Sequence, residues 1–294
     1  MARKANTSKD RIDVYQEVTD RIVAALEEGT VPWHKPWADA GAQRNLRSGK
    51  EYRGVNQLLL SLSDYGSPYW VTFKQAKELG GSVRKGEKSS LVVFWKMLRL
   101  KDEGEDETRT VPMLKHYRVF NVEQCDGLEV PQDERQARDV HPIAACQSIM
   151  ARYRNGPTVQ HGGGRACYMP ARDIVQLPVQ SAFESDEAYY STAFHELIHS
   201  TGHESRLKRD GIEQVAAFGT ATYSREELVA ELGASMLCGQ AGIAPAVLDQ
   251  STAYVASWLK RLKDDRKLVV QAAGKAQRGA DHVLGVTFED GEGR

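Results

Sequence analysis

The chain has 294 residues, of which 41% are hydrophobic and 27% charged, and its net charge is −1 at pH 7. This length suffices for two domains, and no stretch approaches the roughly 18 apolar residues of a membrane helix, so we expect no membrane-spanning helix. The first residues lack the apolar core of a signal peptide, so we expect a cytoplasmic protein. Four scattered cysteines without a C-x-x-C pair indicate neither a disulfide framework nor a structural zinc site.

The N-terminal part of the chain predicts a mixture of helices and strands. Apolar residues recur at helical spacing between Asp10 and Glu28, and Gly29 ends that run. Later runs are rich in β-branched and aromatic residues and are separated by an acidic stretch, as in a hairpin. In chain order we expect helices over 10–28, 54–62 and 72–79, and a β-hairpin formed by 89–100 and 113–122.

Basic and aromatic residues are concentrated in the same part of the chain. Residues 31–100 hold twelve Lys or Arg against five Asp or Glu, and four of the five tryptophans lie in the N-terminal half. Cations can bind phosphates and flat rings can stack on unpaired bases, so one interpretation of this composition is a surface that binds single-stranded DNA. The alternative is an ordinary surface whose lysines are solvated, with Trp70, Phe94 and Trp95 in the core. The predicted DNA-binding residues are Trp33, Lys35, Trp37, Tyr52, Arg53, Lys74, Arg84, Lys85 and Lys88.

Residues 128–141 are charged and lack apolar periodicity, which predicts a linker between two domains. One of the strands that follow is a candidate wall for a cleft that holds an extended peptide, although an ordinary meander fits the pattern equally. His161 lies in a glycine-rich loop between two of these strands, and we do not expect it to bind metal. Beyond the linker we expect a helix over 142–153, strands over 158–160, 166–168 and 173–177, and a helical region over 251–273.

The segment around His195 carries the clearest chemical signal. Ser185 can cap a helix, Gly202 can end it in a left-handed conformation, and no Pro or Gly lies between Ala188 and Thr201. Histidines four residues apart share a helix face, so His195 and His199 can bind one metal ion. The adjacent Glu196 can act as the general base toward water, which is the zincin arrangement.

The third metal ligand must come from elsewhere in the chain. A metzincin would need a histidine at position 205, where this chain has Ser205. The predicted helix over 224–235 offers Glu227 and Glu231, which are four residues apart on one face. We favour Glu227 as the ligand and Glu231 as the acceptor for the other N–H of a ligand histidine. Alternatively, Ser224 and Glu227 form a capping box, in which case Glu231 is the ligand.

Several motifs, in this order, resemble those of the ArdC-type antirestriction proteins of conjugative plasmids. They are the stretches Val31–Trp37, Tyr52–Asn56, Trp70–Ala76, Val83–Lys88, His195–His203 and Glu226–Glu231. The resemblance covers nearly the whole chain and implies an α+β fold with two domains. These are a single-stranded-DNA-binding domain, over 1–127, of a kind shared with certain plasmid primases, and a zincin-like metallopeptidase domain over 142–294. It also implies His195, His199 and Glu227 as metal ligands and Glu196 as the base.

The resemblance implies a protein that binds incoming plasmid DNA and protects it from host restriction enzymes. The alternative is a DNA-dependent metalloprotease that cleaves DNA-associated proteins such as a restriction subunit. The expected cofactor is one zinc ion per chain, with manganese or another divalent ion as an alternative. The expected partner is single-stranded DNA, with double-stranded DNA as a second candidate and no membrane. A priming role lacks support, because no phosphate loop or nucleotidyl-transfer carboxylate cluster is visible in the sequence.

Overall fold

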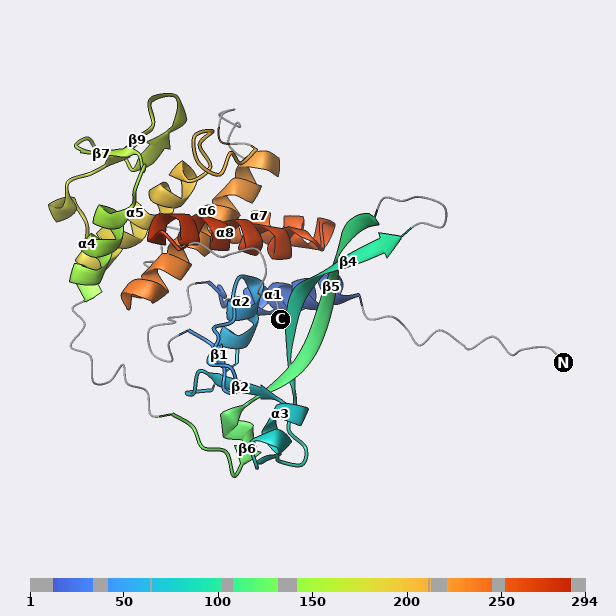
Figure 1. Ribbon diagram of the computed structural model, residues 1–294. Helices are drawn as coiled ribbons and strands as arrows, with labels where there is room; N and C mark the ends of the chain where they lie inside the picture. The colour runs from blue at the N-terminus through green and yellow to red at the C-terminus, as the bar shows by residue number, and fades with distance from the viewer. Residues whose placement is uncertain are drawn as a thin grey trace.

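The computed structural model describes residues 13–33, 42–63, 65–101, 108–131, 142–210, 212, 221–244 and 252–286. Figure 1 shows a sheet with short helices in the N-terminal half and mainly helices in the C-terminal half, with a second small sheet beside them. This mixture confirms the predicted α+β class. None of the described helices is both long enough and apolar enough to cross a membrane.

The N-terminal half is built on a four-stranded sheet with the order β1-β2-β5-β4. Strands β4 and β5 pair in antiparallel register from Ser90 opposite Val119 to Lys101 opposite Thr108, so the predicted hairpin is confirmed. The predicted acidic connection falls largely on residues 102–107, outside the described residues. The strands are β1 (Arg44–Asn45), β2 (Tyr69–Thr72), β4 (Ser90–Lys101) and β5 (Thr108–Asn121), and β3 (Ser82–Val83) pairs separately with β6 (Cys125–Asp126).

Three helices accompany this sheet. They are α1 (Val14–Glu27), α2 (Val55–Ser61) and α3 (Phe73–Glu78). The first begins where the Asp13 carboxylate accepts the backbone N–H of Tyr15, at 3.1 Å, and satisfies one of the free donors of the first turn. From the second, the Asn56 side chain reaches the outer strand of the sheet: its amide donates to the carbonyl of Val93 and accepts the N–H of Val93, both at 2.7 Å.

The C-terminal half places three strands next to a group of helices. The strands are β7 (Thr158–His161), β8 (Cys167–Met169) and β9 (Ile174–Leu177), in the order β7-β9-β8. The helices are α4 (Pro142–Arg152), α5 (Asp186–Ser200), α6 (Ala221–Ala241), α7 (Thr252–Asp264) and α8 (Leu268–Leu284). The helical region predicted over 251–273 is therefore two helices, with a turn in which the Asp265 carboxylate accepts the N–H of Lys267.

Helix α5 begins as predicted but ends for a different reason. The Ser185 hydroxyl accepts the N–H of Ala188 at 3.1 Å, which is the expected N-cap. Gly202 is not among the residues with positive φ, so the predicted left-handed end is wrong. A Cβ at this glycine would lie 2.5 Å from the Ile212 side chain and 3.1 Å from the Arg209 guanidinium. The glycine therefore permits close packing of the loop that follows the helix.

One hydrophobic core extends through both halves of the chain. It contains Ile22 of α1 and Leu58 of α2 together with residues of α4 to α8. Trp33, which follows α1, is fully buried. Its ring forms a T-shaped pair with the ring of Trp258 in α7, with the centroids 5.3 Å apart. The Ser235 hydroxyl of α6 donates to the carbonyl of Trp33. The sequence predicted two domains and gave no sign that they share a core.

Candidate metal centre

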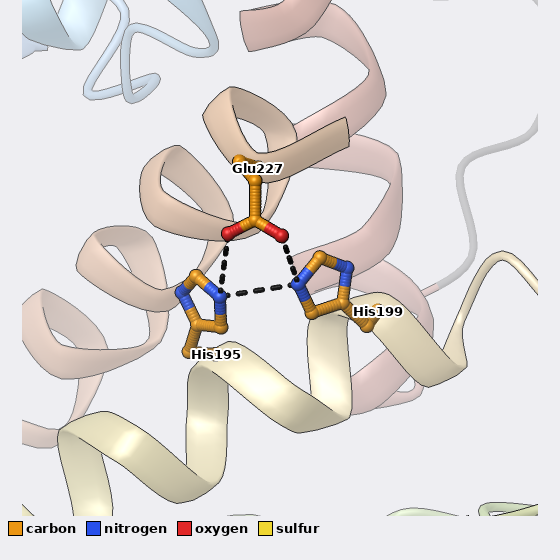
Figure 2. Close-up of side chains that lie close together, drawn as sticks. All are labelled: His195, His199 and Glu227. Atoms are coloured by element: carbon orange, nitrogen blue, oxygen red, sulfur yellow. Dashed lines mark hydrogen bonds and ion pairs between the residues drawn. The ribbon is translucent and has the colours of Figure 1, made fainter. Parts of the chain in front are cut away.

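Three predicted ligands meet between α5 and α6. The Nε2 atoms of His195 and His199 are 3.1 Å apart, since four residues along α5 bring both rings to the same face. The two carboxylate oxygens of Glu227 lie 3.5 Å from Nε2 of His195 and 3.6 Å from Nε2 of His199. Figure 2 shows the carboxylate of α6 directed between the two imidazoles of α5. The three side chains face a single point.

This arrangement fits a divalent metal ion. Ligand atoms bound to zinc at about 2.0–2.1 Å in tetrahedral geometry are roughly 3.3 Å apart, close to the spacing of these three side chains. Two imidazoles and one carboxylate are a donor set that zinc and other divalent ions accept. No other group of three or more His, Cys, Asp or Glu side chains in the described part of the chain has ligand spacing.

Each histidine also has a glutamate at its other ring nitrogen. An oxygen of Glu231 lies 3.5 Å from Nδ1 of His195. This Nδ1 atom is buried and makes no hydrogen bond with the described residues, so the Glu231 carboxylate is near it but not bonded to it. Glu226 lies 3.5 Å from Nδ1 of His199 and accepts two hydrogen bonds from the buried Arg209. Carboxylates in these positions hold imidazoles in the tautomer whose Nε2 is free to bind metal. Sequence reasoning proposed Glu231 for this role and missed Glu226, although Glu226 precedes the favoured ligand.

The capping box is not formed. Helix α6 begins at Ala221, so Ser224 lies inside the helix and not at its N-cap. The Glu227 carboxylate faces the two histidines. Glu231 faces the other nitrogen of His195, on the far side of the ring from the point where the three side chains meet. The geometry therefore favours Glu227 over Glu231 as the third ligand.

The charges of the cluster set its proton affinity. Burial alone would lower the pKa of His195, but Glu227, Glu231 and Glu196 outweigh burial and raise it to about 9. Burial alone would raise the pKa of Glu226. The hydrogen bonds and charges of His199 and Arg209 lower this pKa by more than burial raises it, so the net shift is downward. The carboxylates therefore stabilise a positive charge in the cluster, which either a proton or a metal ion can supply. Glu196, the predicted base, is buried on α5 next to His195.

The described members of the predicted DNA-binding set differ in exposure and in their charged neighbours. Trp33 is fully buried in the shared core, so its assignment as a DNA contact is wrong. Tyr52 is half-buried, with its hydroxyl 3.5 Å from the Asn45 amide. Three of the cations have acidic neighbours: Arg53 pairs with Asp281, Lys74 with Glu78, and Arg84 with Glu87 and Asp126. Lys85 and Lys88 are exposed, and Lys35 and Trp37 lie outside the described residues.

The aromatic residues that the alternative interpretation placed in the core divide into two groups. Trp70 is fully buried, as that interpretation requires. Phe94 and Trp95 are exposed, so for these two residues it is wrong. His161, which was not expected to bind metal, is exposed, and its Nε2 lies 2.8 Å from the hydroxyl of Tyr189.

Two family models match the chain. Residues 12–120 match the N-terminal domain of anti-restriction factor ArdC, and residues 146–275 match a zincin-like metallopeptidase. A metal-free crystal structure of the antirestriction protein ArdC from plasmid R388 is 40% identical, with a TM-score of 0.77, over 94% of this chain and 98% of that chain. Its Mn(II)-bound form is 41% identical, with a TM-score of 0.75, over 95% and 100%.

Relatives among curated proteins differ in length. Two Escherichia coli proteins named DNA primase TraC are 35% and 34% identical over 92% and 96% of this chain. The chain spans only 27% and 20% of their lengths. An uncharacterised protein of Sinorhizobium fredii is 35% identical over 94% of this chain and 92% of its own length.

Proposed function

The chain belongs to the ArdC family of antirestriction proteins, and from this membership we propose that it binds single-stranded DNA and protects incoming plasmid DNA from restriction. The observation that carries the proposal is the similarity to the ArdC protein of plasmid R388 over nearly the full length of both chains. We assign DNA binding to residues 1–127, metal binding to residues 142–294, and a linker to 128–141. The two family models fall on either side of this linker, which supports the division.

The metal proposed for this site is zinc, with His195, His199 and Glu227 as ligands. The zincin-like family model, the ligand spacing and the Mn(II)-bound relative together support a divalent ion. When bound, such an ion would polarise a substrate carbonyl and acidify a water molecule. Glu226 and Glu231 lie 3.5 Å from the Nδ1 atoms and would orient the two imidazoles so that their Nε2 atoms are available to such an ion.

The proposed catalytic step is peptide hydrolysis with Glu196 as the proton carrier. Its carboxylate accepts the proton of the attacking water and delivers it to the amine nitrogen as the peptide bond breaks. Strand β8 is an edge strand that contacts α5, and an extended peptide can pair with such an edge. This placement makes β8 the candidate wall of the substrate cleft.

A second candidate function is DNA-dependent proteolysis of proteins bound to the same DNA. It is favoured by the buried Glu196 beside the ligand cluster, because coating DNA requires no general base. Glu196→Gln removes the base and leaves both histidines in place. If the protein acts by binding DNA alone, this variant protects plasmid DNA as well as the wild type does. If it acts by proteolysis, protection is lost.

The test compares plasmid transfer into restricting and non-restricting recipient cells, with the wild type, Glu196→Gln and Glu204→Gln. Glu204 is an exposed glutamate shortly after α5 and serves as the matched control. Binding of a labelled single-stranded oligonucleotide is measured for the same three proteins at several salt concentrations. A wild-type protein that neither binds the oligonucleotide nor raises transfer into the restricting cells would refute the proposed function.

A further inference from the structure

The β4–β5 hairpin carries an uncovered pair of aromatic rings. Phe94 and Tyr117 are stacked with their centroids 4.2 Å apart and their planes at 19°. The two residues are 40% and 45% exposed, although large aromatic side chains gain most from burial. An exposed aromatic surface of this kind on a soluble domain often marks a binding site.

The alternation of the strands explains why this face is free. Closer to β2, the same face carries Val92 and Val119, which are buried with Leu60 and Trp70. The opposite face carries Leu91 and Val93, which join the main core, and then Trp95, whose ring lies 6.2 Å from that of Tyr15 in α1. Figure 1 shows the hairpin as a long curved ribbon that runs from β2 past α1. The stacked pair therefore occupies the first position beyond the core, on the face away from α1.

The charge on this face is complementary to nucleic acid. Lys115 lies directly opposite Phe94 in the strand register, and it forms an ion pair with none of the described residues. The described hairpin residues on this face are Ser90, Val92, Phe94, Met113, Lys115, Tyr117, Val119 and Asn121, and none of them is acidic. A cation beside two stacked rings is the combination by which proteins bind unpaired bases and their phosphates.

We propose that Phe94, Tyr117 and Lys115 form a base-stacking platform for single-stranded nucleic acid, an inference that rests on the DNA binding proposed above. An unpaired base extends the two-ring stack, and the neighbouring phosphate is neutralised by Lys115. Bases in a duplex are already stacked on both faces, so the platform selects single strands. None of its three residues belongs to the set predicted from the sequence, where hairpin aromatics could not be distinguished from core residues.

The test measures binding of a labelled oligothymidylate to the full-length protein by fluorescence anisotropy. The double variant Phe94→Ala/Tyr117→Ala should raise the Kd by about 5- to 100-fold, the range expected for loss of one base-stacking contact. The double variant Phe94→Tyr/Tyr117→Phe keeps both rings and should stay within about twofold of the wild type. Lys115→Gln should reduce the slope of log Kd against log salt concentration by about 1, because one phosphate contact is lost.

Phe73→Ala is the matched control. Phe73 is 52% exposed in the same half of the chain, but the Lys77 ammonium already lies 4.9 Å over its ring. Its removal should therefore leave the affinity for the oligonucleotide unchanged. Circular dichroism of each variant reports whether the protein is folded. If the alanine variant does not fold, photocrosslinking of wild-type protein to an iodouracil oligonucleotide decides, because the platform requires crosslinks at Tyr117 or Phe94.

The outcomes separate this inference from the proposed function. A folded alanine variant that binds DNA as tightly as the wild type overturns the platform and leaves DNA binding intact. A wild-type protein that does not bind single strands refutes both. If sedimentation shows that the alanine variant changes only the oligomeric state of the protein, the rings form a protein interface and the platform is wrong.

Discussion

Removing the indole of Trp33 should destabilise both halves of the protein together. The side chain is fully buried and packs against Trp258 of α7, and the carbonyl of Trp33 accepts a hydrogen bond from Ser235 of α6, the helix that carries the proposed ligand Glu227. Replacing a buried tryptophan by alanine costs about 3–5 kcal/mol, because the cavity can collapse only in part. Most domains are stable by only about 5–15 kcal/mol, so Trp33→Ala loses a large share of the total.

Hydrogen exchange at increasing urea concentrations tests this expectation, with peptides from β4 and from α6 as separate reporters. Both peptides should lose protection at the same urea concentration, and that concentration should be lower in Trp33→Ala than in the wild type. Trp95→Ala is the control, since this tryptophan is 49% exposed and its removal should cost less than about 1 kcal/mol. Two separate transitions, with only the β4 peptide affected, would refute the shared core.

Three further predictions concern the site and its surroundings. Because His195 has a pKa of about 9, the metal-free protein holds a proton there at neutral pH, and zinc affinity measured with a competing dye should rise about tenfold per pH unit up to that value. The stabilisation that the protonated ring gives the metal-free protein should be complete below its unfolded pKa of about 6.5 and lost as the pH rises through 9. Gly233→Ala places a Cβ 2.8 Å from the Ile198 side chain and should push α6 away from α5. The midpoint of thermal unfolding and the metal affinity should both fall. An unchanged midpoint would contradict this packing. The hydrogen bonds from Arg206 lower the pKa of Asp173, so this pair should stabilise the protein above about pH 3.8 and lose its effect in more acidic solution. Asp173→Asn should abolish that part of the pH dependence of the free energy of unfolding, measured by urea titration.

Local patterns in the sequence were sufficient to predict several of the elements and the shared helix face of two histidines. The hairpin, the capped helix α5 and the shared face of His195 and His199 depend on residues within a few positions of one another. Contacts between distant segments were not predictable in this way. Arg209 and Glu226 meet only after α6 has packed on α5, and Trp33 looked like a surface residue because its partner Trp258 lies far away in the sequence.

The amide of Asn56 has a consequence for behaviour at high local concentration. Strand β4 is the outer strand of its sheet, and free N–H and C=O groups on such a strand can join the sheet of another molecule. The Asn56 side chain imitates one residue of a neighbouring strand and occupies both groups of Val93. Another molecule that approaches this edge therefore meets a blocked position at Val93, which disfavours aggregation by strand addition there.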